Sequence, residues 1–190
     1  MKITNSDALV VVDVQNDFCP GGALPVPDGQ LVVRPINRLV HKFDKVVFSR
    51  DWHPSDHCSF DDDPGFVDQS WPQHCVQDTP GAEFHGDLMV PMDALVINKG
   101  TDANREAYSA FEGGEPLLER LKMWGITRVF VVGLAADVCV RATALDARKF
   151  GFDTVVLTDA TRGVSEEGAA AAFEEMKTAG VQLAHSGDIE

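Results

Sequence analysis

Cys139 is the residue of this chain whose type and position best suit a nucleophile. It follows the apolar run Arg128–Val132, which is typical of a buried strand, and lies in the first turn of a helical stretch that opens near Asp137. Ligands of open α/β sheets bind beyond the carboxyl ends of the strands, and a helix N-terminus carries a partial positive charge that stabilises a thiolate. A cysteine that only packs beneath a helix is the alternative.

Charged side chains follow two further apolar runs. Asp13 comes directly after Ala8–Val12, and Lys99 directly after Ala94–Asn98. Taken singly, they are an ordinary turn carboxylate and a surface lysine. Because parallel strands end at one edge of a sheet, however, an acid, an amine and the thiol are expected together there. Such a group combines a nucleophile, a base and a charge partner.

A second group of polar side chains follows the apolar run Lys45–Ser49. Asp51 and His53 are two residues apart, so they share one face of an extended segment. His57 and His74 come later in the same loop. A carboxylate and imidazoles suit a divalent metal ion of the Zn, Fe or Mn kind. From the spacing alone, a solvated, histidine-rich loop remains the alternative to a metal site.

The elements that must position these residues alternate along the chain. Two further apolar runs, Thr154–Thr158 and the weaker Val181–Ala184, complete the set of expected strands. These runs do not alternate cleanly between apolar and polar residues, which is typical of parallel strands covered on both faces. The expected helical stretches are Leu31–Phe43, Pro116–Trp124, Val138–Phe150 and Ser165–Ala179. Strand–helix alternation implies right-handed crossovers and a parallel sheet. We therefore expect a three-layer α/β sandwich.

Length and composition limit the remaining possibilities. The 190 residues fit a single domain, 1–190, with a long loop at about 50–91 of the kind that is usually functional. The net charge of −14 disfavours nucleic acid and anionic membranes as partners. Without a membrane-length apolar run, a signal-peptide pattern or a C-x-x-C pair, we expect a cytoplasmic protein with reduced thiols. Homo-oligomer formation is left open.

With these features together, the chain resembles the nicotinamidases of the isochorismatase-like cysteine hydrolase superfamily. The similar segments follow the family's order and span most of the chain. They are DVQNDFCPGGAL (13–24), SRDWHPSDHCSF (49–60), WPQHCVQDTPGAEF (71–84), INKGTD (97–102), AYSAFEG (107–113) and GLAADVCVRATALDA (133–147). The resemblance implies a six-stranded parallel sheet with helices on both sides.

The resemblance also implies roles for individual residues. The residues that match the catalytic triad are Asp13, Lys99 and Cys139. The metal ligands correspond to Asp51, His53 and His74, and, in some members only, His57. The residues that resemble the walls of the substrate pocket are Phe18, Trp71 and Tyr108. The backbone N–H groups of Ala135 and Cys139 would form an oxyanion hole, and Leu134–Ala135 resembles a turn with a non-proline cis peptide bond.

The implied activity is hydrolysis of nicotinamide to nicotinate and ammonia through a cysteine thioester, with pyrazinamide as a second substrate. That reaction belongs to pyridine nucleotide salvage and NAD biosynthesis. One alternative is a metal-free relative that acts on isochorismate or a carbamoyl amide, which we expect to lack the aspartate and histidine set. Another is a non-enzymatic metal-binding domain, which would bind a metal ion but form no acyl-enzyme.

Overall fold

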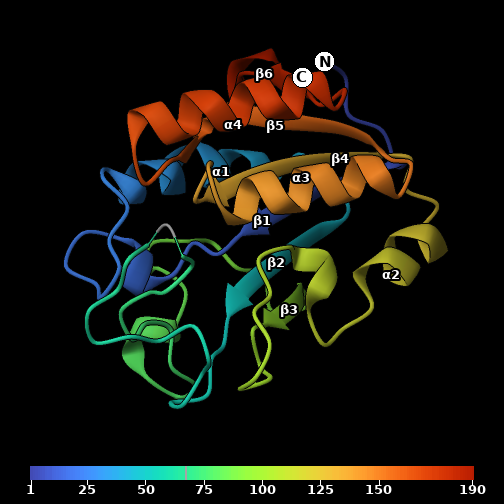
Figure 1. Cartoon of the computed structure of the whole chain (residues 1–190). Helices are drawn as coiled ribbons and strands as arrows, with labels where there is room; N and C mark the ends of the chain where they lie inside the picture. Colours follow the sequence, from blue (N-terminus) through green and yellow to red (C-terminus); the bar gives the residue numbers. More distant parts are fainter. Residues whose placement is uncertain (67) are drawn as a thin grey trace.

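A six-stranded parallel sheet forms the centre of the molecule in the computed structural model, which describes residues 1–66 and 68–190 (Figure 1). The strands are β1 (Asp7–Val12), β2 (Val46–Asp51), β3 (Leu95–Lys99), β4 (Arg128–Leu134), β5 (Asp153–Arg162) and β6 (Gln182–Ala184). They lie in the order β3-β2-β1-β4-β5-β6, and every neighbouring pair is parallel. The prediction of a parallel α/β sandwich is confirmed, although β5 extends to Arg162, beyond the predicted end.

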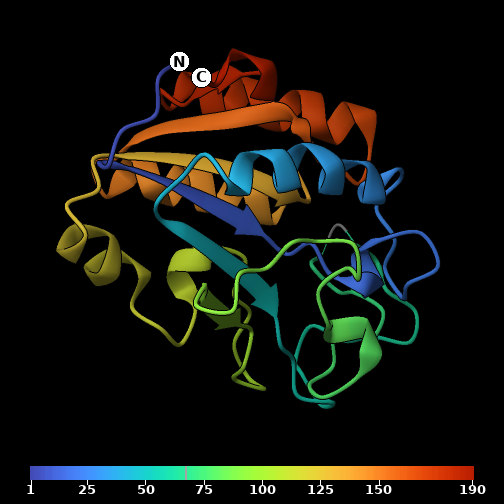
Figure 2. The same ribbon diagram turned by 180° about the vertical axis from the view of Figure 1, so that it is seen from behind.

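Helices cover both faces of the sheet. Within the described ranges the α-helices are α1 (Val33–Val40), α2 (Leu117–Met123), α3 (Cys139–Lys149) and α4 (Glu166–Thr178). In Figure 1, α3 and α4 lie in front of the sheet, and Figure 2 shows α1 on the opposite face. None of these helices has the length and apolar character needed to cross a membrane.

The start of α1 differs from the prediction. A helix was expected from Leu31, but a 3-10 turn, Gly29–Val32, comes first and the α-helix begins at Val33. Pro35 then lies in the first turn of the α-helix. Backbone N–H groups in that turn make no intrahelical hydrogen bond, so the missing N–H of proline costs none. Periodicity alone does not separate a 3-10 turn from the α-helix that follows it.

Two apolar clusters join the layers, one on each face of the sheet. Leu9 and Val11 of β1 pack in the same cluster as Ile36 of α1. Val10 of β1 packs on the other side with Val140 of α3. All of β1 is buried, so both faces of this strand need apolar side chains. This double burial explains the continuous apolar runs in the sequence.

The sheet changes its winding direction at β1, which lies between β2 and β4. In open α/β sheets, such a switch point opens a crevice beyond the carboxyl ends of the strands. Gly133 allows β4 to approach β1 closely there, because a Cβ atom at this position would lie 2.0 Å from the Val12 carbonyl oxygen and its φ is +113°. The next turn contains the expected cis peptide bond, between Leu134 and Ala135.

The long β2–β3 connection lies at this carboxyl edge, as the teal and green segments of Figures 1 and 2 show. Isolated β-bridges fix this connection in place. His53 pairs with Val76, and Gln15, which lies shortly after β1, pairs with Phe84. The connection therefore folds back over the strand ends, where the polar residues identified from the sequence lie.

Candidate active site

The ends of three strands bring Asp13, Lys99 and Cys139 together, as the sequence predicts. Lys99 is the last residue of β3, and its Nζ lies 2.9 Å from Asp13 Oδ2 and 3.5 Å from Cys139 Sγ. Cys139 is the first residue of α3, after the turn that follows β4. All three side chains are buried. A carboxylate, an ammonium group and a thiol therefore meet where bulk water is excluded.

Asp13 is held by the neighbouring strand β2. Its backbone N–H donates to the Ser49 carbonyl oxygen at 3.1 Å, and the Ser49 hydroxyl donates to Asp13 Oδ1 at 2.7 Å. Asp13 Oδ2 accepts no hydrogen bond within the described part of the chain. The Lys99 ammonium is close enough for an ion pair with Oδ2 but is not aligned as a donor. Oδ2 is therefore the oxygen available to receive a proton.

Burial sets the protonation states of the acid and the thiol. It raises the pKa of Asp13 to about 6, because desolvation outweighs the opposing charge of Lys99. Burial also raises the pKa of Cys139 well above its usual value, and the negative charges of Asp13 and Asp51 raise it further, against the lowering effect of Lys99. At neutral pH the pair is a neutral thiol beside a carboxylate.

This result differs from the thiolate expected at a helix N-terminus. The partial charge at the start of α3 and the Lys99 cation do not offset the burial of the sulfur and the two nearby carboxylates. Attack by Cys139 consequently requires a base in contact with it, and Asp13 is in place to serve as one.

The turn before α3 presents unpaired backbone donors. Neither the Ala135 N–H nor the Cys139 N–H donates to another backbone group within the described ranges, whereas the neighbouring Ala136 N–H binds the Arg162 carbonyl oxygen at 2.8 Å. Two free N–H groups beside a nucleophile suit the stabilisation of a developing oxyanion.

Asp51, His53 and His74 form a second buried cluster, whose candidate ligand atoms lie within 4.8 Å of one another. Each histidine uses Nδ1 elsewhere: His53 Nδ1 lies 2.9 Å from the Gly100 carbonyl oxygen, and His74 Nδ1 lies 2.7 Å from that of Pro72. A carbonyl oxygen only accepts, so Nδ1 carries the hydrogen and Nε2 keeps its lone pair. This donor set fits a divalent transition metal ion.

Asp51 also links the two clusters. It lies opposite Lys99 in the register of β2 and β3, and its Oδ1 accepts a hydrogen bond from the Lys99 ammonium. Burial alone would raise the pKa of Asp51, but the Lys99 charge and the neighbouring histidines hold it well below its usual range. Asp51 is therefore a carboxylate at neutral pH, the form that binds a cation.

His57 lies outside this trio of possible ligands. Its Nδ1 lies 2.8 Å from the Ser59 hydroxyl oxygen, and its Nε2 lies 3.1 Å from the Arg105 carbonyl oxygen. Its ring packs 4.2 Å from that of His53, measured between centroids. His57 also belongs to a second group of possible ligands, with His53 and Glu106, so its role as a metal ligand stays a prediction.

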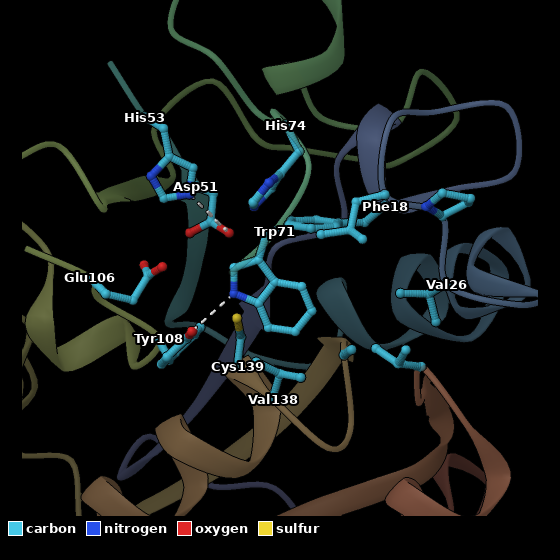
Figure 3. Close-up of a pocket in the computed structure, with 14 residues that line it drawn as sticks. Phe18, Val26, Asp51, His53, Trp71, His74, Glu106, Tyr108, Val138 and Cys139 are labelled. Atoms are coloured by element: carbon cyan, nitrogen blue, oxygen red, sulfur yellow. Dashed lines mark hydrogen bonds and ion pairs between the residues drawn. The ribbon is translucent and has the colours of Figure 1, made fainter. Parts of the chain in front are cut away.

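A cavity opens between the two clusters (Figure 3). The three pocket residues expected from the sequence, Phe18, Trp71 and Tyr108, line it together with Cys139. The Trp71 indole N–H donates to the Tyr108 hydroxyl at 3.1 Å, which joins two of these walls. Its lining is mainly apolar, so the cavity suits a flat aromatic molecule with one polar group.

Several lining residues were not identified from the sequence. They are Leu24, Pro25, Val26, Glu106, Val138 and Val164. Glu106 is one of 30 acidic residues and has no spacing that distinguishes it. The apolar residues come from loops, where no periodicity indicates which way a side chain faces.

Comparison with known proteins adds a family and a set of relatives. Residues 7–188 match the Isochorismatase domain family. The nicotinamidase/pyrazinamidase of Mycobacterium tuberculosis is 46% identical over 185 residues, which cover 93% of this chain and 97% of that protein.

Solved structures resemble the chain over nearly its whole length. The pyrazinamidase of Pyrococcus horikoshii in complex with zinc is 45% identical, covers 95% of this chain and 99% of its own, and superposes with a TM-score of 0.86. The L. infantum protein solved in complex with nicotinate is 38% identical, with coverages of 100% and 98% and a TM-score of 0.90.

Proposed function

Because this chain belongs to the Isochorismatase domain family, we propose that its cavity hydrolyses nicotinamide to nicotinate and ammonia, and pyrazinamide in the same way. The chain is an amide hydrolase, as are its nicotinamidase relatives. The observation that carries the proposal is the contact of a buried thiol, a carboxylate with a free oxygen and a lysine beside an aromatic-walled cavity.

In the first half of the reaction, Cys139 Sγ attacks the carboxamide carbon while Asp13 Oδ2 takes the thiol proton. The carbonyl oxygen becomes an oxyanion, which the N–H groups of Ala135 and Cys139 stabilise. Asp13 then returns the proton to the departing nitrogen, so that ammonia leaves and a thioester remains on Cys139.

In the second half, Asp13 takes a proton from a water molecule, which attacks the thioester carbon. The oxyanion forms again against the same two N–H groups. The thiolate leaves and regains its proton from Asp13. The product is nicotinic acid, which loses its carboxyl proton to solvent and is released as nicotinate. Lys99 holds Asp13 and offsets negative charge as it moves between the carboxylate and the sulfur.

The substrate ring lies between Phe18 and Trp71 in this proposal, and Tyr108 fixes Trp71. A divalent ion held by Asp51, His53 and His74 would supply a Lewis acid for the ring nitrogen and so orient the carboxamide. We infer zinc, iron or manganese from the ligand types, and the zinc in the P. horikoshii relative supports zinc. His57, which packs beside His53, is a further candidate ligand.

The proposed role in the cell is pyridine nucleotide salvage in the cytoplasm. Every group in the scheme comes from one chain, so the chemistry does not require a homo-oligomer. A nucleic acid or membrane partner has no part in it.

We expect a metal-free preparation to lose at least about 10² in kcat/KM, because misplacing a reacting group by 1 Å already costs that much. Dialysis against a chelator, followed by ammonia-release assays with and without added zinc, measures this effect. His53→Ala should resemble the dialysed protein and His85→Ala, a histidine outside the cavity, should resemble the untreated protein. Full activity of the dialysed protein and of His53→Ala would instead indicate that this chain acts without a metal ion, as the metal-free relatives do.

We expect kcat/KM to fall about tenfold per pH unit on the acidic side, because only the carboxylate form of Asp13 accepts a proton. Its pKa is raised to about 6, so the base is fully present above this pH and is lost below it. The charge of Asp51 contributes to this raised pKa, so a cation bound to Asp51 would move the inflection of the profile to a lower pH. The pH profile of the zinc-loaded protein measures it, and an identical inflection in Asp13→Asn would contradict the assignment.

A further inference from the structure

Gln15 binds the backbone of a proposed metal ligand from two sides. Its Nε2 donates to the Asp51 carbonyl oxygen at 2.8 Å, and its Oε1 accepts the Asp51 N–H at 2.8 Å. The same Nε2 donates to the Ala82 carbonyl oxygen at 2.9 Å. The Gln15 side chain is fully buried. Its amide thus fixes the end of β2 and joins it to the loop at Ala82.

Asp17, two residues later, holds the turn that carries His74. Its Oδ2 accepts the Cys75 N–H at 2.7 Å, and its Oδ1 accepts the Ala23 N–H at 3.1 Å. Cys75 has a φ of +46°, a left-handed conformation that non-glycine residues adopt only when neighbouring groups hold it. The carboxylate of Asp17 is the side chain that binds the Cys75 N–H and so helps to hold this turn.

Cys75 also connects the two histidine ligands. Its carbonyl oxygen accepts the His53 N–H at 3.0 Å, while its own N–H is bound to Asp17 and its preceding neighbour is His74. A shift of Cys75 therefore displaces both histidines. Gly81 confirms how closely Asp17 is packed, since a Cβ atom there would lie 2.2 Å from Asp17 Oδ2.

We propose that Gln15 and Asp17 are positioning residues for the metal ligands: Gln15 sets Asp51, and Asp17 sets His74 and His53 through Cys75. The inference rests on the metal site of the proposed function. Neither side chain is among those that line the cavity, so both act through the ligands. Partners that orient metal ligands typically contribute about 10–100-fold to metal affinity.

The chain offers matched controls for both residues. Asn37 bridges a backbone segment as Gln15 does, since it donates to the Asp87 carbonyl oxygen and accepts the Met89 N–H, both at 2.8 Å. Asp159 accepts the Ser186 N–H at 2.7 Å, as Asp17 accepts that of Cys75. Neither control residue contacts the proposed ligands.

The test measures zinc binding by calorimetry on chelator-treated, full-length protein. The variants are Gln15→Met and Asp17→Asn, with Asn37→Leu and Asp159→Asn as controls. We expect about a 10–100-fold rise in the zinc Kd for the first pair and no change for the second. Saturating zinc should restore kcat/KM in the first pair. Alkylation of Cys139 in the metal-free proteins should match that of the unaltered protein.

The inference would be overturned if Gln15→Met and Asp17→Asn bound zinc with the Kd of the unaltered protein. It would also be overturned if the controls raised the zinc Kd equally, or if saturating zinc did not restore kcat/KM. If Gln15→Met does not fold, the partly exposed Asp17 and its control decide the outcome. Failure of the unaltered protein to bind zinc would instead contradict the proposed metal site, so the two failures are distinguishable.

Discussion

Replacing Cys139 with alanine is expected to lower kcat for ammonia release from nicotinamide by about 10⁴–10⁶-fold, the usual scale for the loss of a covalent nucleophile. Cys139 Sγ is the only thiol among the residues that line the described cavity. Without it, no thioester forms, and water would have to attack an unactivated amide directly. The two backbone N–H donors and the proposed metal ligands remain, so binding of nicotinate and zinc should persist.

The measurement compares steady-state ammonia release with zinc binding and thermal stability in the same preparation. Cys58→Ala is the matched control, because this cysteine is exposed and lies outside the cavity. It should retain normal turnover. Near-normal turnover by Cys139→Ala would show that the reaction proceeds without a cysteine thioester.

Replacing Asp13 with asparagine is expected to lower kcat by about 10²–10⁴-fold, the range for loss of a general acid–base group. The amide keeps the shape of the side chain and an acceptor for the Ser49 hydroxyl, but it cannot receive the thiol proton or return one to ammonia. It also removes a negative charge that raises the pKa of Cys139.

This variant tests Asp13 as the base for the thiol. If it is the base, turnover and alkylation of Cys139 by iodoacetamide should both fall near neutral pH, because the buried thiol has lost the group that takes its proton. Alkylation should recover as the pH rises, and near-normal turnover in this variant would contradict the base assignment. Asp7→Asn is a suitable control, since Asp7 lies at the opposite end of β1 and pairs with Arg128. It should change stability rather than kcat.

The sequence predicts how the strand-end residues of the site are laid out because one rule governs their positions. Asp13, Asp51, Lys99 and Cys139 each come at or just after the end of an apolar run, and parallel strands bring such ends to one edge. The strand order was not needed for this inference. The structure adds that β1 lies at the switch point beside β4, so Asp13, directly after β1, and Cys139, after the turn that follows β4, lie beyond the ends of adjacent strands.

Other properties of the site depend on distances that sequence patterns do not contain. The raised pKa of Cys139 reflects how deeply the sulfur is buried and how near the two carboxylates lie. Nor does the sequence show that the two ring nitrogens of His57 contact the Ser59 hydroxyl and the Arg105 carbonyl oxygen. Glu106 reaches the cavity from a loop without periodicity.

The most direct test of the account looks for an acyl group on Cys139 during turnover. An activated aryl ester of nicotinate makes acylation fast, so the thioester should accumulate before water removes it. We expect the mass of acid-quenched protein to increase by one nicotinoyl group in place of one hydrogen. Peptide mapping should assign this group to Cys139, and the group should be lost at the rate of turnover. Turnover without such an adduct, or with the nicotinoyl group on another residue, would contradict Cys139 as the nucleophile.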